Sequence, residues 1–239
     1  MLSVNTLTKY FGDKKAVDGV SFTINKGEIF SLIGPNSSGK TTIVKSIVGL
    51  LQPTEGSVVV CGHDVTKHPE AAKAQIGYIP DEPSIWSHMT GEEFLFFTQA
   101  LFGVEEKARV SGLPKLLSTF NLQGLEKQYF EEYSRGNKQK FSILAAMSHH
   151  PKVLLIDEPI VGLDPTGAEI AKNMFVDYAK NGGSVLLVTH TLPVAEAISD
   201  RIGFLKNGSL LAVGTLKELR TQAGLPVDAS LEEVYQKFA

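Results

Sequence analysis

The chain has 239 residues, 43% of them hydrophobic and 21% charged, a composition typical of an ordinary soluble globular protein. Its net charge is −3, whereas a protein that binds a nucleic-acid backbone is usually basic, so we expect no nucleic-acid partner. The single cysteine, Cys61, excludes an internal disulfide and fits a reducing cytosol, and no apolar run approaches the ~20 residues of a membrane span.

The first third of the chain reads as short strands. Apolar segments separated by turns predict strands at 2–7, 20–24 and 29–33, a helix at about 40–50, and further strands at 57–61 and 75–79. We expect the earliest strands to form an antiparallel β region.

The middle of the chain is predicted to be helical. Phe94, Phe97 and Leu101 share one face of a helix over 90–102, with Glu92 and Glu93 near its start, where they suit the helix dipole. Helical character persists to about residue 150, with expected breaks near Gly112, Pro114 and Gly124. We therefore predict an inserted helical subdomain at about 84–150.

The last third alternates strands with helices. Strands are expected at 153–156, 184–188 and 201–205, with a helix at 168–179 and another beginning near Pro193. Such alternation predicts an α/β fold with a mostly parallel sheet, since the wholly apolar strands suit burial on both faces. We expect one domain over 1–215, followed by a helical tail at 216–239 in two short helices.

A phosphate-binding loop follows the strand at 29–33. The pattern G-x-x-x-x-G-K-[ST] is matched by Gly34, Pro35, Asn36, Ser37, Ser38, Gly39, Lys40 and Thr41, with Thr42 next. The glycines let successive amide groups face one anion, and the helix that starts near Gly39 adds the positive end of its dipole. Lys40 supplies charge for the β and γ phosphates, and the Thr41 hydroxyl is placed to coordinate Mg²⁺. The loop predicts a P-loop nucleotidase that binds a nucleoside triphosphate and Mg²⁺.

Two carboxylates end the apolar strand at 153–156, at the sheet edge where ligands bind. Asp157 is expected to hold Mg²⁺ directly or through water. Glu158, one residue on, is expected on the other face and is the better candidate to orient or deprotonate the attacking water. His190 ends the strand at 185–189 at the same edge, from which it can reach the γ phosphate. We therefore predict Glu158 and His190 as catalytic.

A second phosphate-binding surface is predicted at 133–137. The Ser134 hydroxyl, the unhindered Gly136 amide and a helix N-terminus suit a phosphate. Because the chain already has one phosphate loop, this surface would serve the nucleotide of another copy.

These motifs together resemble the ATP-binding subunit of an ATP-binding cassette (ABC) transporter, over essentially the whole sequence. Tyr133 to Asn137 match the family signature LSGGQ. The resemblance implies ATP as the ligand and two copies packed head to tail, each signature closing over the ATP of its partner. It further implies that Asp164 belongs to a loop that communicates across the dimer, and that Phe11, with Tyr10 as the alternative, stacks on adenine.

The sequence also departs from the family pattern. Asp81 stands where the family commonly has a glutamine that contacts Mg²⁺, and we expect Asp81 to reach the metal through water. Arg135 and Asn137 depart from the signature, and Ser37 replaces a frequent glycine. These features resemble subunits of exporters of the ABC-2 type.

The leading hypothesis is an ATPase engine for an exporter, held at the cytoplasmic face of the membrane by separate transmembrane permease subunits. These would dock on the helical insertion near 81–102, where apolar surface is offered by five aromatic residues: Trp86, Phe94, Phe96, Phe97 and Phe102. One alternative is a soluble ATP switch, although a second cassette, a coiled coil and basic extensions are not present. Another is a nucleotide sensor with weak hydrolysis.

Overall fold

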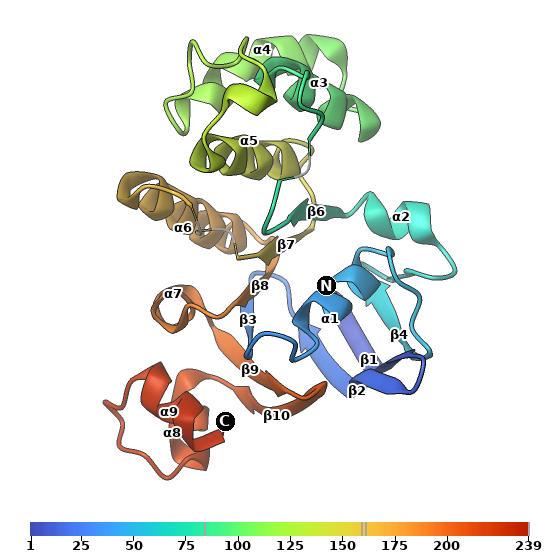
Figure 1. The fold of residues 1–239 in the computed structure, drawn as a ribbon, viewed down its shortest axis with the longest axis vertical. Coiled ribbons are helices and arrows are strands. Elements are labelled where there is room, and N and C mark those ends of the chain that lie inside the picture. Colours follow the sequence, from blue (N-terminus) through green and yellow to red (C-terminus); the bar gives the residue numbers. More distant parts are fainter. Residues whose placement is uncertain (84, 159, 161, 239) are drawn as a thin grey trace.

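The structure is a computed structural model that describes residues 1–83, 85–158, 160 and 162–238. Residue 84, where the helical insertion was expected to begin, and residue 239, the end of the expected tail, lie outside the described residues. Figure 1 shows a central sheet with an N-terminal β region at one side, a group of helices at the top, and the C-terminal helices at the bottom.

The N-terminal β region is a four-stranded antiparallel sheet in the order β2-β1-β4-β5. Its strands are β1 (Leu2–Phe11), β2 (Lys14–Ile24), β4 (Glu55–Val60) and β5 (His63–Asp64). The prediction of an antiparallel region is confirmed, although β1 and β2 are longer than expected. The two-residue β5 was missed because it is too short to show any periodicity.

The central sheet has six strands in the order β10-β9-β3-β8-β7-β6. They are β3 (Ile29–Ile33), β6 (Ile76–Ile79), β7 (Val153–Asp157), β8 (Ser184–Thr189), β9 (Arg201–Lys206) and β10 (Ser209–Gly214). All but β10 run parallel, and every residue of β3, β7 and β8 is buried, as expected for strands covered on both faces. The mostly parallel α/β fold is thus confirmed.

Strand β10 was not predicted, although the sequence carries a signal for it. Asn207 and Gly208 separate it from β9, and both have a positive φ, of 50° and 81°. Such a pair favours a two-residue hairpin turn, which here reverses the chain at the sheet edge.

Strand register places the ends of four strands together. Ile79 pairs with Ile156, Ile156 with Leu187, and Ile33 with Thr189. Because parallel strands end at the same edge, the segments that follow β6, β7, β8 and β3 all emerge there. The phosphate loop then leads into α1 (Lys40–Ile47), which ends three residues earlier than expected, and α2 (Pro69–Lys73) lies further along the chain.

The helical part contains α3 (Gly91–Leu101), α4 (Glu106–Ser118), a short 3₁₀ turn (Phe130–Glu132) and α5 (Arg135–Met147). Thr90 caps α3 in a capping box with Glu93. The expected breaks near Gly112 and Pro114 are wrong, since α4 runs through both residues. Proline costs an interior helix about 3 kcal/mol, and here apolar packing of α4 side chains against the core offsets it: Leu113, Leu116 and Leu117.

The remaining helices are α6 (Pro165–Lys180), α7 (Leu192–Ile198), α8 (Leu216–Gln222) and α9 (Leu231–Phe238). The two C-terminal helices pack on the central sheet. Phe204 of β9 contacts the rings of Tyr235 and Phe238, and Leu219 and Leu231 are buried in the same cluster. Among the described residues, no helix is long and apolar enough to cross a membrane.

Candidate functional site

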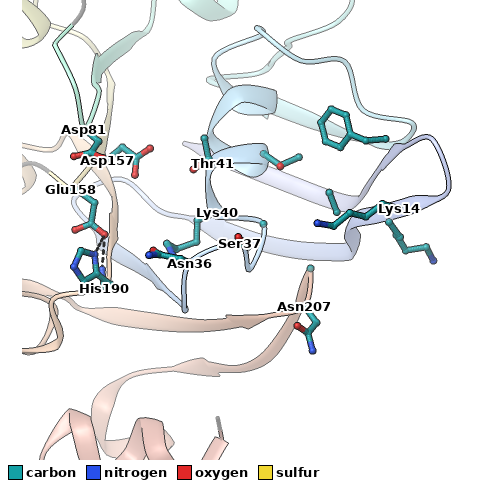
Figure 2. Close-up of a pocket in the computed structure, with 16 residues that line it drawn as sticks. Lys14, Asn36, Ser37, Lys40, Thr41, Asp81, Asp157, Glu158, His190 and Asn207 are labelled. Carbon is teal, nitrogen blue, oxygen red and sulfur yellow. Dashed lines mark hydrogen bonds and ion pairs between the residues drawn. The ribbon is translucent and has the colours of Figure 1, made fainter.

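A cavity of about 930 Å³ opens at the carboxyl edge of the central sheet (Figure 2). It brings together many of the residues that the sequence singled out: Phe11, Asn36, Ser37, Gly39, Lys40, Thr41, Thr42, Asp81, Asp157, Glu158 and His190. It is also lined by residues that sequence reasoning missed: Lys14, Lys15, Ala16, Asn207 and Gly208. The cavity therefore combines the phosphate loop with the acidic strand ends.

Lys40 is held inside the curl of the phosphate loop. Its Nζ donates to the carbonyl oxygens of Gly34 and Pro35 at 2.6 and 2.9 Å. Burial lowers the pKa of Lys40, while the charges of Glu158 and Asp157 act in the opposite direction. A buried ammonium needs such partners, and a phosphate would be a stronger one.

The shape of this loop depends on two glycines. A Cβ at Gly39, where φ is 110°, would lie 2.7 Å from the carbonyl oxygen of Ala16. At Gly34 a Cβ would lie 2.2 Å from the carbonyl oxygen of Leu205. Ser37 also has a positive φ, of 65°, which explains why this position favours glycine.

The turn between β9 and β10 supports the phosphate loop through backbone hydrogen bonds. The Gly208 amide donates to the carbonyl oxygen of Ser38 at 2.8 Å, and the Gly208 carbonyl accepts from the Asp18 amide at 2.8 Å. These bonds explain why Asn207 and Gly208 line the cavity. The Asn-Gly pair, a hairpin signal, was the sequence feature that could have revealed this support.

Asp157 is a buried carboxylate at the end of β7. Burial raises its pKa from the ordinary 3.8 to about 6, and the charges of Glu158 and Asp81 add to the effect, while Lys40 and Lys45 oppose it. Negative charge at this point is therefore unfavourable without a cation nearby. Oxygen donors from Thr41, Asp157 and Asp81 line the same cavity, and oxygen ligands are those that Mg²⁺ prefers.

The described residues do not form a metal centre on their own. Within that part of the chain, no group of three histidine, cysteine or acidic side chains is assembled to hold a metal. A cation in this cavity would therefore need oxygens from a phosphate ligand or from water, as is usual for Mg²⁺.

Glu158 is held by its neighbours on β8. One carboxylate oxygen accepts from the Thr189 hydroxyl at 2.9 Å, and the other accepts from the His190 amide at 2.8 Å and lies 2.5 Å from His190 Nδ1. The expectation that Glu158 faces away from Asp157 is wrong, since both line the cavity. A φ of 49° at Glu158 ends the alternation of the strand and explains the difference.

Phe11 and Tyr10 differ in their surroundings. Phe11 is half exposed and lines the cavity beside Lys14 and Lys15. Tyr10 is not among the cavity residues, and its ring lies under Lys15 Nζ at 5.3 Å. The geometry favours Phe11 as the ring available to a ligand.

The residues of the second predicted phosphate surface lie outside this cavity. Ser134 caps α5 and accepts from the Asn137 amide at 3.2 Å, and a Cβ at Gly136 would lie 2.7 Å from the Gly162 carbonyl oxygen. Asp164 caps α6 and forms an ion pair with Lys140 at 2.8 Å. The first turn of α5 therefore packs on the turn that precedes α6, away from the chain's own phosphate loop (Figure 1).

Comparison with known proteins gives consistent matches. The family described as "ABC transporter" matches residues 17–161. The ABC-type transporter ATP-binding protein EcsA of Bacillus subtilis is 36% identical over 98% of this chain and 95% of its own length. The linearmycin resistance ATP-binding protein LnrL of the same species is 32% identical over 94% of this chain and 72% of its own. A solved structure of an ATP-binding subunit of an ABC transporter is 34% identical, with a TM-score of 0.95 over 100% of this chain and 99% of that one.

Proposed function

The chain belongs to the family of ABC transporter ATP-binding subunits, and on that premise we propose that this ATPase works as a head-to-tail pair that powers export through separate transmembrane subunits. One observation carries the assignment of ATP hydrolysis. A single cavity joins the Lys40 loop to the paired Glu158 and His190, so the groups that bind phosphate and those that act on water share one space.

ATP binding is assigned to the loop and to Phe11. The amides of 34–42 and the Lys40 ammonium suit the phosphates, and the half-exposed Phe11 ring, which lines the same cavity, suits adenine. Lys14, which pairs with Phe11 across the β1–β2 turn, and Lys15 line the same cavity and add positive charge to it.

Mg²⁺ would be held by the Thr41 hydroxyl and Asp157, with Asp81 reaching it through water. When bound, the ion neutralises charge on the phosphates. Asp157 suits this role because burial, with the charges of Glu158 and Asp81, raises its pKa, and a bound cation would offset these effects.

Hydrolysis is assigned to Glu158 as the group that orients and deprotonates the attacking water. The Thr189 hydroxyl and the His190 amide hold the carboxylate in one orientation. His190 is the better-exposed member of the pair, so with Nδ1 turned to Glu158 its Nε2 remains available to the γ phosphate.

The pair of subunits follows from the position of Ser134 and Gly136. These residues begin α5 outside the chain's own cavity, and we assign them to the nucleotide of the partner, with Asp164 at the interface. ATP at about 100 times its dissociation constant would then favour the closed pair by about 2.7 kcal/mol per site.

A complementation experiment tests this arrangement. In the hydrolysis-deficient Glu158→Gln chain, we expect Mg-ATP to produce dimers by light scattering. Adding either Lys40→Ala or Ser134→Glu should leave monomers, because each change damages one half of every composite site. Mixing these two variants should restore dimers, because one intact site then forms from the Lys40 of one chain and the Ser134 of the other. A mixture that stays monomeric would contradict the head-to-tail pair.

Transmembrane subunits would dock beside the helical part. An apolar groove of about 360 Å³ lies there, and its lining includes Tyr78, Ile85, Phe94 and Phe102. Near it, Trp86 is 64% exposed and contacts the ring of Phe97. This surface favours an engine coupled to a membrane partner at the cytoplasmic face over a free-standing switch, and the name of LnrL, a resistance protein, favours export.

A further inference from the structure

Two residues that depart from the family pattern contact each other. Arg135 Nη2 donates to Asp81 Oδ1 at 3.2 Å, and both side chains are about half exposed. Asp81 follows β6 and lines the catalytic cavity, whereas Arg135 is the first residue of α5.

The position of Arg135 is fixed by a third segment. A Cβ at Gly162, where φ is 89°, would lie 3.1 Å from both Cγ and Cδ of Arg135. The Arg135 stem therefore lies against the turn that follows the catalytic strand. Gln139, one turn further along α5, also points to the β6 end, where its Nε2 lies 3.5 Å from the Pro80 carbonyl oxygen.

The charges explain why Asp81 needs this partner. Asp81 stands near two other carboxylates, and its charge is one of the causes that raise the pKa of Asp157. A lone negative side chain there would repel its neighbours and turn toward solvent. The guanidinium of Arg135 gives it a fixed partner of opposite sign, so Asp81 and Arg135 together are neutral, as the glutamine and glycine common in the family are.

We propose that Arg135 is a positioning residue that holds the Asp81 carboxylate at the magnesium side of the cavity. The proposal rests on the proposed function, since Asp81 acts there through the metal. Arg135 follows Ser134 directly, so the contact that closes over the partner's nucleotide is joined to the chain's own metal site.

A double-mutant cycle tests the assignment. Arg135→Ala is made in the natural chain and in Asp81→Gln, and the Mg²⁺ concentration that gives half-maximal ATPase activity is measured. In the natural background we expect it to rise about two- to fivefold, the effect of one half-exposed ion pair. In Asp81→Gln, Arg135→Ala should change it by less than about 1.5-fold, because the charge that Arg135 holds is gone. Arg135→Lys should recover part of the loss, and Lys107→Ala, an exposed change on α4, should have no effect.

A second measurement does not depend on ATP hydrolysis. The melting temperatures of the four nucleotide-free proteins in the cycle should be non-additive by about 1–3 °C, as expected for an interacting surface pair. Additive melting temperatures, or an equal rise in the Mg²⁺ requirement in both backgrounds, would overturn the proposal. If instead the proposed function is wrong, the complementation experiment should show no ATP-dependent pairing, while the melting temperatures of the cycle should still be non-additive.

Discussion

The catalytic cavity and the helical part are built on opposite principles. The cavity gathers charged and polar groups at the ends of buried strands, whereas the helical part is held by aromatic rings packed edge to face, such as Phe130 against Phe94 and Tyr133. In the cavity, burial moves the pKa of Lys40 down and that of Asp157 up. The helical part is held mainly by apolar packing, while the cavity contains charges that a nucleotide and a cation would stabilise.

The two regions meet where the end of β6 and the turn after β7 approach the helical part. The β6 end leads into α3, and the first turn of α5 rests on the Gly162 turn. We therefore expect changes in the cavity to abolish chemistry, and changes on the helical surface to leave chemistry intact while uncoupling it from a partner.

The largest effect is expected at Glu158. Glu158→Gln removes the group assigned to the attacking water, so ATP turnover should fall by about 10² to 10⁴ while ATP-dependent pairing is kept. Steady-state phosphate release measures the first and light scattering the second. Glu70→Gln, an exposed change on α2, serves as the matched control. A fall of less than tenfold would show that Glu158 is not the general base.

The next effect concerns stability and pH at Asp157. Its folded pKa of about 6 lies above the ordinary 3.8, so the folded chain binds more protons than the unfolded chain between these values. Stability of the nucleotide-free protein should therefore fall as pH rises through about 4 to 6, by at most about 3 kcal/mol from this group.

Asp157→Asn removes that dependence. Its melting temperature should exceed that of the natural protein at pH 7.5, by about 2–4 °C for each kcal/mol recovered, and the difference should shrink toward pH 4. The same variant should lose ATPase activity. Equal melting curves at pH 7.5 would show that the ionised Asp157 carboxylate does not destabilise the folded protein.

The smallest effect on the isolated chain is expected at Trp86. Because this ring is largely exposed, Trp86→Ala should keep ATP turnover within about twofold. It should nevertheless abolish co-purification of a polytopic membrane protein from detergent extracts, whereas Val110→Ala, an exposed change on α4, should not. A large loss of ATP turnover in the isolated chain would contradict the expectation that changes on the helical surface leave the chemistry intact.

Much of the fold was predictable because its signals are local. The apolar strands β3, β7 and β8, the phosphate loop and the acids that end β7 each lie in a few consecutive residues, and the family assignment that follows from them is confirmed. The roles of individual site residues and the boundary between domain and tail stay predictions. Errors arose where packing outweighed local preference, as in α4, which continues through Pro114.

The sequence by itself determined that this chain is an ABC-type ATPase with a mostly parallel sheet, because the motifs and the apolar strands each carry a local signal. Only the tertiary structure decided which distant residues meet: Gly208 behind the phosphate loop, His190 on Glu158, and Arg135 on Asp81. These contacts depend on strand register and helix packing, which join segments far apart in the chain. A short stretch such as Asn207 and Gly208 signals its own turn but not which distant segment that turn contacts.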